Sequence, residues 1–127
     1  MKGVSGMGKK ILIIDDNEVD LLIVKRYLSR AGYNEIISAG NADEGIKKVE
    51  QERPDLIILD TLLLSSNGFE VCQLIREKYN QTNPKIIIIT GSIDAVDAVK
   101  ARKTGADDYC AKTSDCVPLL EAVKKLI

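Results

Sequence analysis

The sequence contains no histidine and no tryptophan, and only 4% of its 127 residues are aromatic. The lack of histidine excludes imidazole metal ligands, histidine general bases and a phosphohistidine on this chain. The scarcity of aromatic residues argues against the base-stacking platforms of single-stranded nucleic-acid binders. Charges nearly balance, with 18 Lys and Arg against 19 Asp and Glu. We therefore expect no direct nucleic-acid partner and no membrane partner.

Cysteines and long apolar runs are also sparse. The three cysteines are an odd number without C-x-x-C spacing, which is a poor basis for disulfides or a zinc site. We interpret them as small buried residues of a protein in a reducing compartment. No stretch approaches the length of a membrane span, and the first ten residues lack the apolar region of a signal peptide. These features predict a cytoplasmic location.

The length predicts one domain, over residues 10–127, preceded by a flexible leader at residues 1–9. Residues 3–9 match the G-x-x-x-x-G-K spacing of a phosphate-binding loop. Such a loop needs a strand before it, a helix after it, and Ser or Thr after the lysine. Here Lys10 and a predicted strand follow instead, so we interpret this segment as part of the mobile leader.

Strand and helix patterns alternate along the rest of the chain. Strands are predicted near residues 11–14, 35–38, 55–59, 86–89 and 108–111. Helices are predicted near residues 17–31, from Asn41 toward Pro54, around 69–75, and near 93–103 and 119–127. Three of the strands are apolar throughout, as expected when helices cover both faces of a sheet. The pattern predicts an α/β fold with a doubly wound, five-stranded parallel sheet.

Polar residues capable of phosphoryl chemistry follow four of these strands. Asp15 and Asp16 follow the first strand, Asp60 the third, Thr90 the fourth and Lys112 the fifth. The carboxyl ends of parallel strands share one edge of the sheet, so these side chains should gather there. Clustered carboxylates without His or Cys favour Mg²⁺ over zinc. The set therefore predicts a small metal and phosphoryl site.

Each of these residues also has a simpler interpretation. Acids near a helix start are common because they favour the helix dipole, which would account for Asp15 and Asp16. Lys112 could be an ordinary surface lysine, and Thr90 could belong to a plain strand-to-helix turn. We favour a functional interpretation only for the set as a whole.

The motifs, taken in order, resemble the receiver domain of two-component response regulators, which has the fold of chemotaxis regulators. The resemblance covers nearly all of residues 10–127 and rests on the ordered set of motifs more than on any single one. The matching segments are Ile13 to Asn17, Pro54 to Asp60, Asn67 to Glu70, Ile88 to Gly91, Gly105 to Tyr109, and Ala111-Lys112. The resemblance implies a flavodoxin-like sheet with strand order 2-1-3-4-5 and five helices.

The resemblance also implies roles at the site. Asp60 would be the phosphoacceptor, and Lys112 would pair with the phosphoryl group. Asp16 would bind Mg²⁺ directly and Asp15 chiefly through water. The backbone carbonyl of Leu62 would complete the protein ligands of the metal.

A conformational switch is implied as well. Thr90 would draw toward the phosphoryl group, and Tyr109 would move from exposed to buried. The helices near 94–103 and 119–125 would then carry the output. The implied partners are a sensor histidine kinase or phosphotransfer protein, followed by a downstream effector or output domain. A phosphorylation-dependent homodimer stays open.

Three residues depart from the family pattern. Leu64 stands where the family favours proline, Asn67 where it favours aspartate, and Thr113 where proline usually follows the lysine. The Lys-Pro bond of related domains is often cis, and a cis bond before Thr113 would be costly. The loop after Asp60 and the presentation of Lys112 are therefore expected to differ from those of relatives.

We favour a phosphoacceptor signalling domain that catalyses only its own phosphorylation and dephosphorylation. One alternative is a pseudo-receiver, an interaction module that works without phosphate; the missing prolines motivate it. Another is a Mg²⁺-dependent phosphohydrolase, but haloacid-dehalogenase-type phosphatases carry a second acid where this chain has Leu62. A flavin-binding domain is disfavoured because no Ser/Thr/Gly-rich loop follows the first strand.

Overall fold

Apolar strands form the centre of the molecule. The computed structural model describes residues 8–64, 66–79 and 83–127, so most of the predicted leader lies outside the described residues. The parallel strands are β1 (Lys10–Ile14), β2 (Glu35–Ala39), β3 (Leu56–Asp60), β6 (Lys85–Thr90) and β7 (Asp108–Ala111). The helices are α1 (Glu18–Arg30), α2 (Ala42–Glu52), α3 (Gly68–Lys78), α4 (Ala95–Lys103) and α5 (Val117–Leu126).

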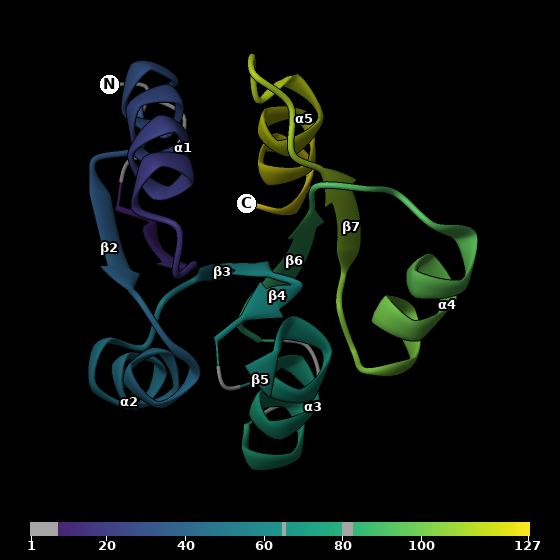
Figure 1. Cartoon of the computed structure of the whole chain (residues 1–127). Coiled ribbons are helices and arrows are strands. Elements are labelled where there is room, and N and C mark those ends of the chain that lie inside the picture. Colours follow the sequence, from purple (N-terminus) through teal and green to yellow (C-terminus); the bar gives the residue numbers. More distant parts are fainter. Residues whose placement is uncertain (1–7, 65, 80–82) are drawn as a thin grey trace.

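The five strands lie in the order β2-β1-β3-β6-β7 (Figure 1). Counting only these strands, this is the expected 2-1-3-4-5 order of a doubly wound fold. After β1 the chain adds β2 on one side of it, and then adds β3, β6 and β7 on the other side, so the order of the strands reverses between the neighbours β1 and β3. Crevices at such a reversal point, outside the carboxyl ends of the strands, are where ligands bind in this architecture.

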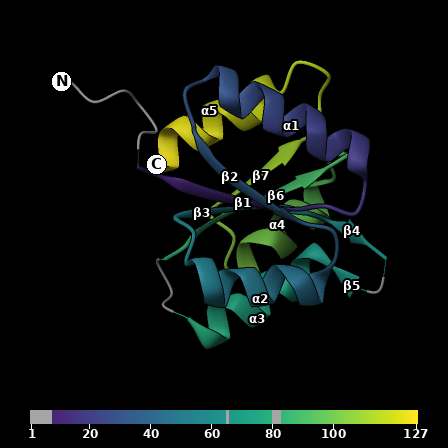
Figure 2. The same cartoon turned by 90° about the vertical axis from the view of Figure 1, so that its left-hand side faces the viewer.

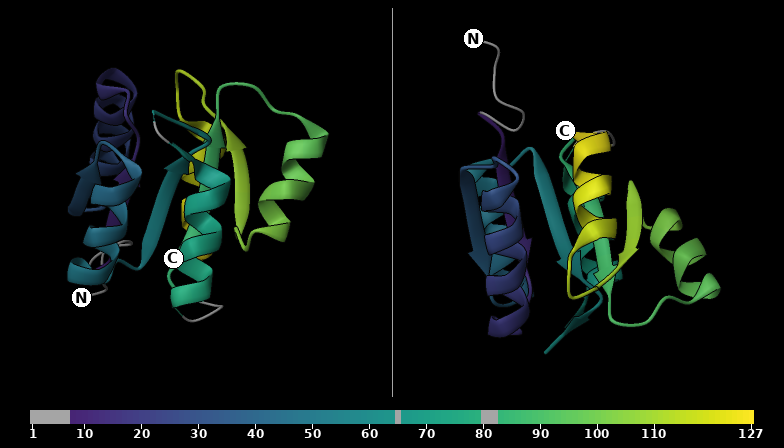
Figure 3. Two further views of the ribbon diagram at one scale, coloured as in Figure 1. Left: turned by 60° about the horizontal axis from the view of Figure 1, so that its bottom comes forward. Right: turned by 90° about the horizontal axis from the view of Figure 1, so that it is seen from above.

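Helices cover both faces of the sheet. Figure 2 shows α1 and α5 on one side of the sheet and α2, α3 and α4 on the other. The two views of Figure 3 agree, with α1 and α5 side by side when seen from above. None of the helices in the described ranges has the length and apolar character needed to cross a membrane.

Successive side chains of the central strands point to opposite faces of the sheet and belong to two separate apolar clusters. In β3, Ile57 and Leu59 pack under α2, α3 and α4, whereas Leu56 and Ile58 pack under α1 and α5. All four side chains are completely buried. Each such side chain contributes roughly 1.5–3 kcal/mol by leaving water. Burial on both faces explains why the strand sequence shows no polar alternation.

Side-chain caps fix where four of the helices begin. Asn17, Asn41 and Asn67 each accept a hydrogen bond from the backbone N–H three residues later, and Asp94 caps α4. These bonds satisfy amides that have no partner inside the helix. They place the first turns of α1 and α3 next to the ends of β1 and β3.

Two features differ from the pattern predicted from sequence. The segment after Asp60 is not wholly irregular, because β4 (Leu62–Leu63) and β5 (Ser66–Asn67) pair in an antiparallel hairpin. Three of the apolar residues in the first half of α1 do not face the core, whereas Leu21 packs against it. Val19 and Leu22 are exposed, and the helix buries Val24 and Leu28 instead.

The cysteines are all free and buried, as expected. Burial raises the pKa of the Cys110 thiol to about 12, so this thiol is protonated at neutral pH. In the described chain the cis peptide bond is Asn83–Pro84, and the Lys112–Thr113 bond is trans.

Candidate functional site

Three carboxylates meet at the carboxyl edge of the sheet. Asp15 and Asp16 follow β1, and Asp60 is the last residue of the neighbouring β3. One oxygen from each of the three lies within 4.8 Å of the others. Asp15 and Asp60 are buried, with 2% and 5% of their surface exposed. The structure therefore brings together the three acids that were predicted to cluster.

Lys112 supplies the positive charge of the site. Its Nζ lies 3.2 Å from Asp60 Oδ2 and 3.1 Å from Asp15 Oδ2. It also donates a hydrogen bond of 2.7 Å to Asp20 Oδ2, on the first turn of α1. Lys112 directly follows β7, and its backbone N–H donates to the Thr90 carbonyl oxygen, which holds the end of β7 against β6. The predicted position of Lys112 in the acid cluster is thus observed.

Burial and charge shift the protonation of the site. Burial, reinforced by the nearby Asp15 charge, raises the pKa of Asp60 to about 6 despite the opposing effect of Lys112. Burial alone would lower the pKa of Lys112, but the hydrogen bond to Asp20 and the charges of Asp60 and Asp15 outweigh it and raise this pKa. Lys112 is therefore charged at neutral pH, and Asp60 is mostly ionised.

The donor set suits a hard divalent cation. Asp15 Oδ2 is fully buried and accepts no hydrogen bond from any described residue, since the Lys112 contact lacks hydrogen-bond geometry. The Lys112 ammonium 3.1 Å away is shared with Asp60 and Asp20, so this single charge does not neutralise the cluster. Clustered carboxylate oxygens are the ligands that Mg²⁺ prefers. Asp15, Asp16 and Asp60 therefore fit such an ion.

A glycine positions α3 against the nucleophile strand. A Cβ at Gly68 would lie 2.3 Å from the backbone oxygen of Asp60, closer than atoms can approach. The Gly68 N–H also donates to the Thr61 carbonyl oxygen at 3.0 Å. Only glycine allows this contact, which closes the hairpin in which Leu62 pairs with Asn67. The Leu62 side chain is 77% exposed.

The two predicted switch residues lie on β6 and β7. Thr90 is buried at the end of β6, and its Oγ1 donates to the Ser92 carbonyl oxygen at 3.1 Å and accepts from the Ser92 N–H at 3.2 Å. Its hydroxyl is thus held by its own turn. Tyr109 on β7 is half-buried and packs against the core. Its hydroxyl is buried and has no hydrogen-bond partner in the described part of the chain.

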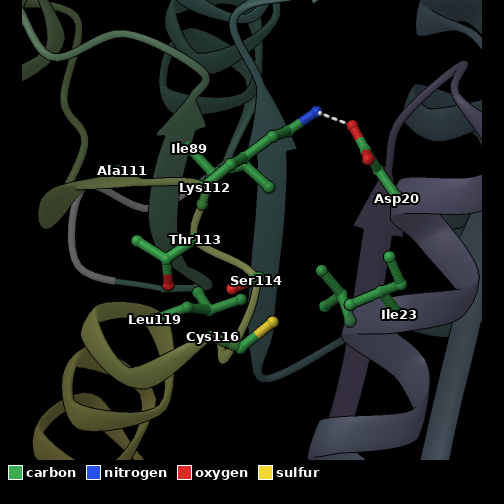
Figure 4. Close-up of a pocket in the computed structure, with 10 residues that line it drawn as sticks. Asp20, Ile23, Ile89, Ala111, Lys112, Thr113, Ser114, Cys116 and Leu119 are labelled. Atoms are coloured by element: carbon green, nitrogen blue, oxygen red, sulfur yellow. Dashed lines mark hydrogen bonds and ion pairs between the residues drawn. The ribbon is translucent and has the colours of Figure 1, made fainter.

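Sequence reasoning missed one member of the site, Asp20. Figure 4 shows its carboxylate and the Lys112 ammonium pointing toward each other across a pocket between α1 and α5. The residues are 92 positions apart, so no local pattern connects them. Helical spacing gives no signal either, because Asp16 precedes the N-cap Asn17 and only Asp20 lies on α1.

Comparison with known proteins identifies the family. A model of the response regulator receiver domain matches residues 11–124. The chain belongs to the response regulator receiver family. This membership agrees with the flavodoxin-like sheet order and with the acid cluster at its carboxyl edge.

Curated relatives of this receiver are longer regulators. The alkaline phosphatase synthesis transcriptional regulatory protein PhoP of Bacillus subtilis is 39% identical over 84% of the chain, which covers 43% of that protein. The transcriptional regulatory protein AfsQ1 of Streptomyces coelicolor is 35% identical over 80% of the chain and is covered over 44% of its length. The receiver thus spans less than half the length of these relatives.

Solved receivers share the whole fold. The response regulator TrrA of Thermotoga maritima, in complex with Mg²⁺ and BeF, is 34% identical with a TM-score of 0.84, over 94% of this chain and 99% of that one. A receiver from Methanospirillum hungatei is 32% identical with a TM-score of 0.81, over 92% and 91% of the two chains.

Proposed function

We propose that this receiver accepts a phosphoryl group on Asp60 from a phosphohistidine of a sensor histidine kinase or phosphotransfer protein. The observation that carries the proposal is the position of Asp60, a buried carboxylate inside an acid cluster and 3.2 Å from a lysine ammonium. The phosphohistidine lies outside these 127 residues, because they contain no histidine. The receiver acts as a signalling domain that catalyses its own phosphorylation and dephosphorylation.

In the proposed step, an Asp60 carboxylate oxygen attacks phosphorus in line with the P–N bond of the donor. The new O–P bond makes an acyl phosphate, and the P–N electron pair leaves with the imidazole, which takes a proton. Lys112 is placed to hold a phosphoryl oxygen by its charge, since its Nζ already contacts Asp60 Oδ2. Hydrolysis by water reverses the switch.

Asp16 and Asp60, with the Leu62 carbonyl and with Asp15 through water, would hold the Mg²⁺ that this chemistry uses. When bound, that ion neutralises charge on the phosphoryl oxygens. The approach of one oxygen from each of Asp15, Asp16 and Asp60 to within 4.8 Å of the others supports this assignment. The affinity should be modest, because Mg²⁺ keeps several waters when few carboxylates bind it.

Phosphorylation is proposed to act through Thr90. Its hydroxyl would exchange the Ser92 carbonyl for a phosphoryl oxygen, a stronger, charge-assisted acceptor. The Tyr109 side chain would respond by a shift in population from an exposed to a buried conformation. The face formed by α4 and α5 would then present the changed surface to a downstream effector, an output domain or a second copy.

Exposed apolar residues beside the site support a protein as donor. Val19 follows β1, Leu62 and Leu64 follow β3, and Ile93 follows β6, and all four are exposed by more than half. They lie on segments that leave the same edge of the sheet as the acid cluster. Apolar side chains around a polar centre are typical of protein docking surfaces.

The test is labelling by a small phosphodonor. Incubation with acetyl phosphate and Mg²⁺ should add one phosphoryl group per chain, seen by mass spectrometry, and Asp60→Asn should abolish it. Asp16→Ala should lower both labelling and Mg²⁺ binding. Labelling that survives Asp60→Asn would move the nucleophile elsewhere. An unlabelled wild-type protein would favour the phosphorylation-independent interaction module.

A further inference from the structure

The shortest contact of Lys112 is not with the proposed nucleophile. Its Nζ lies 2.7 Å from Asp20 Oδ2, against 3.1 Å and 3.2 Å for the oxygens of Asp15 and Asp60. Asp20 is the only one of the three that comes from a helix, and its side chain is 36% exposed. The ammonium is therefore shared between the acid cluster and the first turn of α1, and Figure 4 shows it pointing at the Asp20 carboxylate.

Asp20 is held in place by the cap of α1. Its backbone N–H donates to Asn17 Oδ1 at 2.9 Å, and the Asn17 N–H donates to Asp15 Oδ1 at 2.9 Å. Together with the contacts of Lys112 to Asp20 and Asp15, these bonds form a closed ring of four residues. The ring fixes the Asp20 carboxylate at a set distance from the cluster before any ligand binds.

The position of Lys112 creates a competition. Its ammonium contacts Oδ2 of Asp15 and Oδ2 of Asp60, and both residues belong to the cluster that suits a divalent cation. Two cations that share these carboxylates repel each other strongly in a buried site. When a divalent cation binds, the Lys112 ammonium therefore needs an acceptor outside the cluster. The Asp20 carboxylate, which it already contacts at 2.7 Å, can serve as that acceptor.

We propose that Asp20 is a positioning residue that offers the Lys112 ammonium an anionic acceptor on the α1 side of the acid cluster, so that the ammonium can withdraw from Asp15 and Asp60 when a divalent cation binds there. This inference rests on the proposed function, because it assumes that the cluster takes Mg²⁺. Asp20 acts through Lys112 and has no contact with the reacting atoms.

The test is the Mg²⁺ affinity of the full chain, measured by amide chemical-shift titration. Asp20→Asn replaces the anionic outer acceptor of Lys112 by a neutral amide, so the ammonium should favour Asp15 and Asp60 and weaken Mg²⁺ binding by about fivefold. Asp20→Glu keeps a carboxylate within reach and should stay within about twofold of wild type. Glu18→Gln removes the same charge from an exposed position of the same helical turn and should also have little effect.

A double-mutant cycle separates positioning from long-range charge. In a Lys112→Met background, Asp20→Asn should no longer alter Mg²⁺ affinity, because there is no ammonium to hold. An equal loss with and without Lys112 would show that Asp20 acts by its charge alone and would overturn the proposal. So would a wild-type affinity in Asp20→Asn, or a loss in Asp20→Glu as large as in Asp20→Asn.

The outcomes also distinguish this inference from the proposed function. If wild type binds Mg²⁺ and is labelled on Asp60, but Asp20→Asn behaves like wild type, only the role of Asp20 fails. If wild type binds no Mg²⁺, the metal assignment of the proposed function fails and the positioning role fails with it.

Discussion

At the scale of single residues, the site keeps a carboxylate charged where water is largely excluded. Asp60 is buried beside Asp15, and Lys112 offsets only part of the cost of ionising it. A cation bound between the two carboxylates would relieve this repulsion, and carboxylates perturbed in this way cluster at functional sites. The same arrangement makes the metal-free protein less stable than it could be.

We expect this cost to depend on pH. The pKa of Asp60 rises from 3.8 to about 6 on folding, so between these values the folded protein binds a proton that the unfolded chain has released. Stability should therefore fall as pH rises through this window. In EDTA, Asp60→Asn should match wild type near the lower value and exceed it by about 1–3 kcal/mol above the upper one. Urea denaturation at several pH values measures the difference.

The control for this experiment is Asp43→Asn, which removes an exposed acid from the first turn of α2. Its effect on the free energy of unfolding should be small and should not follow the same pH profile. If Asp60→Asn gave no gain in stability at neutral pH, burial of the Asp60 charge would be wrong as the source of the shift.

Thr90 carries a prediction about signalling. Its hydroxyl is bonded to Ser92, so Thr90→Ala removes a local turn contact and should leave the acid cluster in place. The variant should bind the phosphate mimic beryllofluoride but lose the conformational response around Tyr109. Amide chemical shifts with and without the mimic test this. Equal shifts in Thr90→Ala and wild type would contradict the proposed switch.

At the scale of elements, one buried arginine connects three parts of the fold. Arg76 on α3 donates to the carbonyl oxygens of Gly105 and Pro84 and pairs with Asp107 at 2.7 Å. Asp107 also accepts from the Ile86 N–H at 2.8 Å. The group ties α3 to the start of β6 and to the turn between α4 and β7.

Breaking this group should be costly. Arg76→Met removes a buried cation from a paired acid and from two carbonyls, so it should lower the free energy of unfolding by about 3 kcal/mol. Arg102→Met, at an exposed position on α4, should change it by less than about 0.5 kcal/mol. Denaturant unfolding of both variants gives the comparison. Similar values for the two would contradict a structural role for Arg76.

The elements differ in how well sequence predicted them. β1, β3 and β6 were predictable because uninterrupted apolar runs have one stable placement, between two layers of helices. The β4–β5 hairpin was not, since each strand has only two residues and Ser66 and Asn67 carry no strand pattern. The exposed apolar start of α1 also contradicts simple amphipathic expectation, because apolar periodicity does not distinguish a core face from a docking face.

At the site, the acids and Lys112 were predictable because strand ends in a parallel sheet meet at one edge. The contact between Asp20 and Lys112 was not, because it depends on how α1 leans toward the end of β7. The same holds for the Thr90 hydroxyl, whose partner is chosen by the geometry of a single turn. The strand order predicts which side chains lie close together, but the hydrogen-bond partner of each side chain depends on the detailed three-dimensional structure.

At the scale of the whole molecule, the two faces of the sheet have different surroundings. The cluster under α1 and α5 lies next to the pocket that Lys112 and Asp20 line, whereas Tyr109 packs against the cluster under α2, α3 and α4. Asp60 lies at the end of a strand that borders both. A change at that strand end can therefore reach either layer of helices.

The completely buried central strands have a consequence for labelling with deuterium. Amides of β1, β3 and β6 are paired on both sides and covered on both faces, so they should exchange only when the whole domain unfolds. Amides in the segments that follow these strands should exchange through local opening. The exchange rates of the slowest amides therefore report global stability. A phosphoryl-dependent change in the segments after the strands can be measured as a change in their exchange rates relative to these slowest amides, in the same sample.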